Sequence, residues 1–134
     1  MRTHTAIIIA LFLFALCACE KPPGPGGRST VSGKVYAYDF DNTQNYLISH
    51  GYSSGEKVYI IYGNGSSIGN NVSTSADGSF EFKYLNKGHY KVYVNSLDTS
   101  HKIKGNNTEI PVIIEFDLGA KENLELKDFV IARN

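Results

Sequence analysis

Hydrophobic and polar side chains alternate with a period of two through most of the chain after residue 29. Phe80 and Phe82 fall on one side of the segment Ser79–Leu85, and Glu81 and Lys83 fall on the other. Such alternation is typical of a β-strand with one buried face, because successive side chains point to opposite faces. It predicts strong strands at Thr30–Tyr38, Ser79–Leu85, His89–Asn95, Ile110–Phe116 and Asn123–Ile131. A sixth strong strand is predicted at Lys57–Tyr62, which is apolar on both sides as in a central strand, and a weaker seventh at Asn71–Ala76.

Turn signals separate these segments. Asp77-Gly78 follows the weak strand and predicts a tight hairpin turn, since glycine adopts positive φ without strain. Asn86-Lys87-Gly88 predicts a second tight turn. No segment after residue 20 has a sustained helical period. The sequence therefore predicts an all-β domain over residues 30–134, an antiparallel two-sheet sandwich of about seven strands.

Four tyrosines fall on the outward side of this pattern, at Tyr36, Tyr38, Tyr59 and Tyr93. A tyrosine combines a large apolar ring with a polar tip, which suits protein interfaces and the stacking of sugars. The same residues also stabilise the outer face of a sheet through cross-strand pairing. We favour cross-strand pairing and keep the binding role open.

The first 18 residues have the composition of a signal peptide. After Arg2, Ala6–Leu16 runs without a polar side chain. As a helix this segment rises about 16 Å, roughly half of the ~30 Å hydrocarbon core of a bilayer. It is therefore too short to span a membrane and matches the apolar region of a secretory signal.

The residues that follow, Leu16-Cys17-Ala18-Cys19, resemble the lipobox of bacterial lipoproteins. The resemblance implies cleavage after Ala18 and attachment of diacylglycerol to the sulfur of Cys19. Two or three acyl chains then hold the protein on a membrane, because each buried methylene adds about 0.8 kcal/mol. The implied location is the cell envelope, with the outer membrane expected and the periplasmic or surface face left open.

Residues 19–29 are expected to form a tether. They hold three of the four prolines in the chain and are rich in glycine, so no regular element is predicted in Glu20–Ser29. Ten extended residues at about 3.1 Å each reach at most ~31 Å. The sandwich is thus expected close to the membrane, on a short stalk.

Charge and cysteine content exclude one class of partner and one source of stability. The chain carries 13 Lys and Arg against 13 Asp and Glu, and this balance argues against a nucleic acid as partner. Its only cysteines are Cys17 and Cys19, so the domain is predicted to fold without disulfides. Burial of apolar side chains must then supply its stability.

No motif for catalysis stands out. The chain has no HExxH, no cysteine-based zinc spacing, no phosphate-binding GxxxxGK[ST] and no Gly-x-Ser-x-Gly. Asp39-x-Asp41-Asn42 offers oxygen ligands, but the glycine and distal glutamate of a calcium loop are missing. We expect no catalytic residues, no metal and no cofactor.

Residues 30–95 are similar to a known family. The similarity rests on Val31-Ser32-Gly33-Lys34-Val35, on Thr74-Ser75-Ala76-Asp77-Gly78-Ser79-Phe80-Glu81-Phe82, and on Leu85, Gly88, Tyr90 and Val92. This pattern resembles the carboxypeptidase regulatory-like domain. The resemblance implies a transthyretin-like β-sandwich that acts as a non-catalytic scaffold or adhesion-type module in bacterial envelopes.

The order of the strands predicts where a partner binds. Successive loops of a sandwich alternate between its two ends, so Asp39–Glu56 and Ser96–Glu109 should lie opposite the tether, together with Asp77-Gly78. Long loops on a rigid scaffold are frequent binding sites. These loops carry six candidate binding residues, Tyr46, His50, Tyr52, His101, Lys102 and Lys104. The expected ligand is an envelope protein, and the alternative is a carbohydrate bound by exposed tyrosines.

Overall fold

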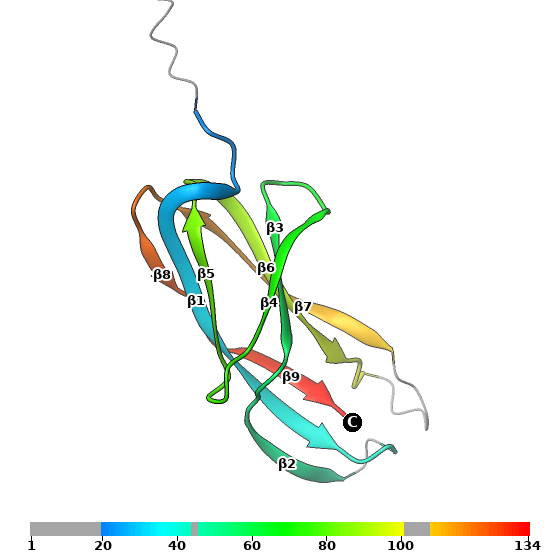
Figure 1. The fold of residues 1–134 in the computed structure, drawn as a ribbon. Coiled ribbons are helices and arrows are strands. Elements are labelled where there is room, and N and C mark those ends of the chain that lie inside the picture. The colour runs from blue at the N-terminus through cyan, green and yellow to red at the C-terminus, as the bar shows by residue number, and fades with distance from the viewer. Residues whose placement is uncertain (1–19, 44–45, 101–107) are drawn as a thin grey trace, which may run out of the picture.

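The computed structural model describes residues 20–43, 46–100 and 108–134. They form two β-sheets that face each other in a sandwich (Figure 1). The strands are β1 (Pro25–Phe40), β2 (Leu47–Tyr52), β3 (Lys57–Tyr62), β4 (Ile68–Ser73), β5 (Ser79–Leu85), β6 (Gly88–Leu97), β7 (Glu109–Leu118), β8 (Asn123–Glu125) and β9 (Phe129–Arg133). In these ranges no helix is long and apolar enough to cross a membrane. The predicted all-β sandwich is confirmed.

The long strand β1 organises the first sheet. On one edge it pairs antiparallel with β5 along its first half and with β2 along its second half. The change occurs at Val35, whose N–H donates to Gly78 O at 2.9 Å and whose carbonyl accepts from Ser53 N at 2.9 Å. On the other edge β1 pairs with β8 and then β9. The second sheet has the order β4-β3-β6-β7 and is antiparallel throughout.

The core lies between the sheets and follows the predicted alternation. Val58 and Ile60 of β3 are fully buried, whereas Tyr59 between them is half-buried on the outer face. The four tyrosines predicted to point outward do so. The core cluster consists of Val31, Val35, Ala37, Val58, Ile60, Phe80, Phe82, Leu85, Tyr90, Val92, Val94, Leu118, Leu126, Phe129 and Ile131.

Two features of the strand pairing differ from the expectation. The segment Asn123–Ile131 forms two strands, β8 and β9, and both run parallel to β1 rather than antiparallel. The strand β2 was not predicted, because nearly all its residues are exposed and no alternation marks it. It returns along only half of β1, so the loops still alternate between the two ends as expected.

The turn at Asp77-Gly78 is tight but does not close a hairpin. Gly78 N donates to Ser75 O at 2.9 Å, and Ser79 N donates to Asp77 Oδ1 at 3.1 Å. The turn joins β4 of one sheet to β5 of the other. Asp77-Gly78 therefore predicts a tight turn correctly, but it does not predict which strands pair on either side of the turn.

The expectation that Glu20–Ser29 lacks regular structure is wrong. The strand β1 already begins at Pro25, and the residues before it are docked on the domain. Gly24 N donates to the buried Tyr90 hydroxyl at 2.8 Å, and Asn86 N donates to Gly24 O at 2.8 Å. The Asn86 side-chain amide donates to the carbonyls of Pro22 and Pro25. Proline lacks an N–H donor, but its carbonyl still accepts hydrogen bonds, and this segment uses that capacity.

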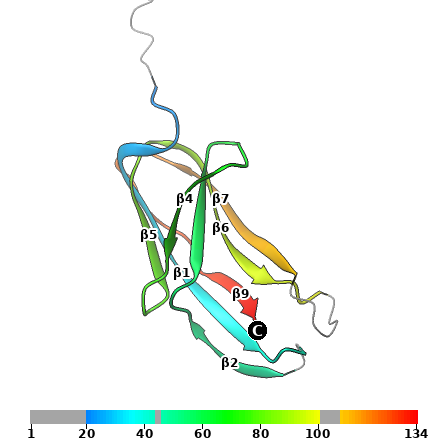
Figure 2. The ribbon, with the colours of Figure 1, turned by 45° about the vertical axis from the view of Figure 1, so that its right-hand side comes forward.

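The described loops divide between the two ends of the domain (Figures 1 and 2). Of the loops predicted at the far end, residues 101–107 lie outside the described residues, and the Asp77-Gly78 turn lies beside Val35, midway along β1. Residues 63–67, 86–87 and 119–122 lie at the end where Glu20 enters, which we call the N-terminal end. Residues 41–43 and Tyr46 lie at the opposite end, which we call the distal end, with β2 beside them. The N-terminal segment and the loop that precedes β2 are therefore on opposite sides of the domain.

Candidate functional site

Aromatic side chains gather on the outer surface of β1 and β2 at the distal end. Val35 and Ala37 of β1 point into the core, so Tyr36 and Tyr38 point outward. Register places Tyr52 of β2 opposite Tyr36, and His50 opposite Tyr38. We call this set, Tyr36, Tyr38, His50 and Tyr52, the tyrosine face.

The rings of the tyrosine face pack against one another mainly edge to face. The centroid of Tyr36 lies 5.4 Å from that of Tyr38 at an interplanar angle of 61°, and 5.3 Å from that of Tyr52 at 82°. His50 stacks on Tyr38 at 5.7 Å and 29°. The Tyr36 hydroxyl also lies 2.5 Å from His50 Nδ1. These contacts fix the rings in a surface of defined shape.

Tyr52 reaches across β1 from β2 toward β9. Its hydroxyl donates to Asp128 Oδ2 at 2.9 Å, and the Lys34 ammonium lies 4.9 Å from its ring centroid. The hydrogen bond to Asp128, together with the negative charge of that carboxylate, raises the pKa of Tyr52 above its ordinary value. Half of the Tyr52 surface is nevertheless exposed. The ring is thus held in place while its face stays open to a partner.

Further apolar side chains border the tyrosine face. Val130 of β9 lies beside Tyr36 and is 54% exposed. Tyr46, just before β2, is 74% exposed, and Leu47 and Ile48 at the start of β2 are 48% and 69% exposed. The strand β2 is an edge strand and its sequence, Leu47–Tyr52, contains no Lys, Arg, Asp, Glu or Pro. Charges and prolines are the usual means by which edge strands avoid pairing, so this edge is unprotected.

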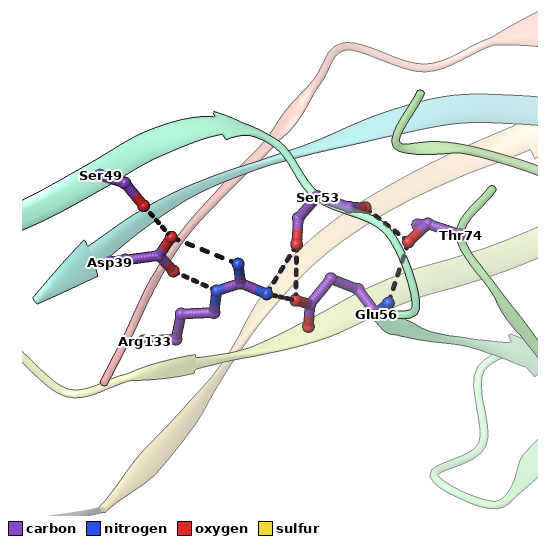
Figure 3. Close-up of polar contacts among 6 residues, drawn as sticks. All are labelled: Asp39, Ser49, Ser53, Glu56, Thr74 and Arg133. Carbon is purple, nitrogen blue, oxygen red and sulfur yellow. Dashed lines mark hydrogen bonds and ion pairs between the residues drawn. The ribbon is translucent and has the colours of Figure 1, made fainter. Parts of the chain in front are cut away.

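On the inner side of the same sheet, a polar cluster forms around Arg133 (Figure 3). Its guanidinium contacts Asp39 of β1 and Glu56 before β3, and it donates to Ser53 Oγ at 2.7 Å. Ser49 Oγ donates to Asp39 Oδ2 at 2.5 Å. These bonds hold the pKa of Asp39 below its usual range and raise that of Arg133.

Thr74 completes this Arg133 cluster from the end of β4. Its hydroxyl donates to Ser53 O at 2.6 Å and accepts from Glu56 N at 2.9 Å (Figure 3). The cluster therefore ties β1 and β9 to the β2–β3 connection and, through Thr74, to the start of the β4–β5 connection. A groove of ≈ 460 Å³ runs beside it, between β9 and the second sheet, lined in part by Glu56, Tyr59 and Arg133. Because Asp39 and Glu56 are both engaged by Arg133, the arrangement serves to hold the two sheets together at this end.

The structure separates the six candidate binding residues. His50 and Tyr52 belong to the tyrosine face, and Tyr46 lies at its border in the loop before β2. His101, Lys102 and Lys104 lie outside the described residues. Tyr36 and Tyr38 were recognised as outward residues but not as site residues, because their neighbourhood depends on the unpredicted strand β2.

The acidic loop candidates for a metal do not converge. Asp39 contacts Arg133, whereas Asp41 Oδ1 accepts from Tyr46 N at 2.9 Å. Across residues 20–43, 46–100 and 108–134, no group of three or more His, Cys, Asp or Glu side chains is arranged to hold a metal ion.

A second tyrosine pair lies on the outer face of the other sheet. Tyr59 of β3 and Tyr93 of β6 are directly opposed, and their rings stack at 4.9 Å and 15°. Both rings are half-buried. This geometry is the cross-strand pairing that the sequence favoured, and it needs no ligand to explain it.

Comparison with known proteins assigns neither a family nor a function to the chain. No protein-family model matches the chain, and no curated protein matches it in sequence. The resemblance to the carboxypeptidase regulatory-like domain therefore stays a prediction.

Proposed function

We propose that the protein is a lipid-anchored, non-catalytic module of the bacterial cell envelope that binds another envelope protein through the tyrosine face. The observation that carries the proposal is the cluster of the exposed Tyr38, His50 and Tyr52 around the half-buried Tyr36, at the end opposite Glu20. With Cys19 acylated, this face points away from the membrane and toward a partner. The anchor itself rests on the lipobox-like segment Leu16–Cys19.

The chemistry of the face favours a protein over a sugar. Sugar stacking needs a flat aromatic surface, but Tyr36 meets both Tyr38 and Tyr52 at steep angles. Aromatic rings mixed with apolar neighbours and polar tips are typical of the energetic centre of protein interfaces. The unprotected edge of β2 adds a second means of recognition, because an extended segment of a partner could pair with it.

The polar groups nearby support a binding role rather than catalysis. The charged side chains of the Arg133 cluster are paired with one another, and the His50 ring contacts Tyr36 and Tyr38. A catalytic site instead needs acid, base or nucleophile groups that converge on an open pocket.

Site-specific photocrosslinking in native membranes tests this proposal. A photoreactive residue at Tyr52 or Tyr38 should capture one and the same protein, and the capture should be lost when Tyr36→Ser is added. Tyr84 is the matched control, since it is an exposed tyrosine on a different part of the sheet. Equal capture from Tyr84, or different products from Tyr52 and Tyr38, would contradict a specific protein site.

A further inference from the structure

We infer that the N-terminal end of the domain carries a binding groove for anionic phospholipid headgroups. The inference rests on the proposed acylation of Cys19, which brings this end to the bilayer. It concerns a different surface from the tyrosine face and predicts a separate property, recognition of the membrane's charge.

A bulge near the start of β1 builds the groove. It lies within residues 19–29, the segment expected to be a tether. Pro25 and Ser29 of β1 both pair with Leu85, so residues 26–28 are looped out of the sheet. Gly26 has φ 106°, a conformation that L-residues rarely adopt, and this allows the loop. Together with the loop at 86–87 and the turn at 120–121, the bulge surrounds a groove of ≈ 590 Å³.

Four cationic side chains line this groove, Lys21, Arg28, Lys87 and Lys121. All four residues are exposed. Glu20 is the one carboxylate in the lining, and it forms an ion pair with Lys87. Within the part of the chain that the structure describes, Lys21, Arg28 and Lys121 make no ion pair. The groove therefore holds an excess of positive charge without an internal counter-ion.

Charge is distributed unevenly along the domain. Residues 20–28, 86–88 and 118–122 contain four Lys or Arg and two Asp or Glu. The other described residues contain six Lys or Arg and eleven Asp or Glu. An anionic membrane attracts the net positive N-terminal end and repels the net negative remainder of the domain. The electrostatic field therefore favours an orientation with the N-terminal end at the bilayer and the tyrosine face away from it.

The docking of residues 20–25 places the groove close to the anchor. Glu20 is paired with Lys87, and Pro22 and Pro25 are held by Asn86. From Cys19 to Lys21 the chain spans only two residues, about 7 Å when extended. This distance is within the Debye length of roughly 8 Å at physiological salt. Anionic headgroups around the anchor are thus near enough to interact with the groove.

The test uses the mature, acylated protein reconstituted in lipid nanodiscs. One preparation contains phosphatidylcholine alone, and the other contains equal amounts of phosphatidylcholine and phosphatidylglycerol. The rate of acylation by an amine-reactive reagent is measured at each lysine by mass spectrometry. A nearby anionic headgroup keeps an ammonium protonated and so slows its acylation.

We expect Lys21, Lys87 and Lys121 to react about fivefold more slowly with phosphatidylglycerol present, the factor that corresponds to ~1 kcal/mol per cation at an anionic surface. High salt should abolish the difference. Lys83 and Lys127 serve as internal controls, because they are exposed residues outside the groove. The variant R28Q/K121Q should lose the effect at Lys21 and Lys87, whereas K83Q/K127Q should keep it.

The other outcomes are distinct. Equal rates in both preparations, or equal slowing at Lys83 and Lys127, overturn headgroup recognition while acylation of Cys19 stands. If inorganic phosphate added to phosphatidylcholine discs slows the same lysines as much as phosphatidylglycerol does, the groove binds free phosphate and the headgroup assignment is wrong. A mature chain without lipid on Cys19 overturns both the anchor and this inference, and the intact mass reveals it directly.

Discussion

Replacing Tyr90 with phenylalanine tests whether residues 20–25 are truly part of the folded domain. The Tyr90 side chain is fully buried, and its hydroxyl accepts from Gly24 N at 2.8 Å and donates to Asn86 O at 2.7 Å. Phenylalanine keeps the ring and its contacts with Tyr62 and Phe116. The substitution therefore removes the hydrogen bonds of the hydroxyl, including a longer one to Gly24 O, and little packing.

The magnitude follows from the burial of the groups left behind. Gly24 is buried, so its N–H cannot turn to water for a replacement partner. A buried polar group without a partner costs about 1–3 kcal/mol. For a domain of this length, each kcal/mol lowers Tm by roughly 4 °C, so Y90F should lower Tm by about 4–12 °C.

Calorimetry and amide hydrogen exchange measure the two consequences. Y90F should lower Tm and increase exchange at Gly24, and exchange at Asn86 N should also rise because that N–H donates to Gly24 O. Y84F is the matched control, since the Tyr84 ring is 71% exposed. If Y90F is as stable as Y84F and the Gly24 amide stays protected, the N-terminal segment is not docked as described.

Three further predictions concern the Asp39 carboxylate, the Tyr52–Asp128 pair and Gly27. Since Arg133 and Ser49 hold the pKa of Asp39 low, the stability from this carboxylate is present above its unfolded pKa of about 3.9 and is lost as pH falls through the lower folded value. Denaturant unfolding across acid pH should show this loss, and D39N should flatten it. The Tyr52 pKa is raised by Asp128, so the stabilisation from this pair persists below pH ~10 and disappears as pH rises through the folded pKa. Ultraviolet titration should show one tyrosine in D128N that ionises at lower pH than in the unmodified protein, and an unchanged titration would contradict the pairing. G27A should destabilise the domain by about 1–3 kcal/mol, because its Cβ would lie 1.8 Å from Leu85 O, whereas G65A, with its nearest neighbour at 4.0 Å, should be near neutral in thermal unfolding.

Most strands could be predicted because one face of each is buried. Phe80 and Phe82 enter the core while Glu81 stays exposed, and the resulting alternation is visible in the sequence. The strand β2 has no such contrast, since it is exposed on both faces and pairs with only half of β1. The strand β2 forms because its backbone pairs with that of β1, and no local pattern within Leu47–Tyr52 predicts this pairing.

The site was predicted only in part, for the same reason. His50 and Tyr52 were identified from loop position, but their contact with Tyr36 requires the register of β1 and β2. The Arg133 cluster was missed because Arg133 lies 94 residues from Asp39 in the chain and 77 from Glu56. The composition of residues 20–29 wrongly predicted a free tether. Proline carbonyls that accept hydrogen bonds and glycines that allow the bulge instead build a segment docked on the domain.

The intact mass of the protein isolated from membranes tests the central claim most directly. The proposal predicts a chain that begins at Cys19 and carries diacylglycerol and an added acyl chain, with C19S neither labelled by palmitate nor retained with membranes. A mature chain that starts elsewhere, or a C19S variant that still takes up palmitate and sediments with membranes, would contradict an anchored module.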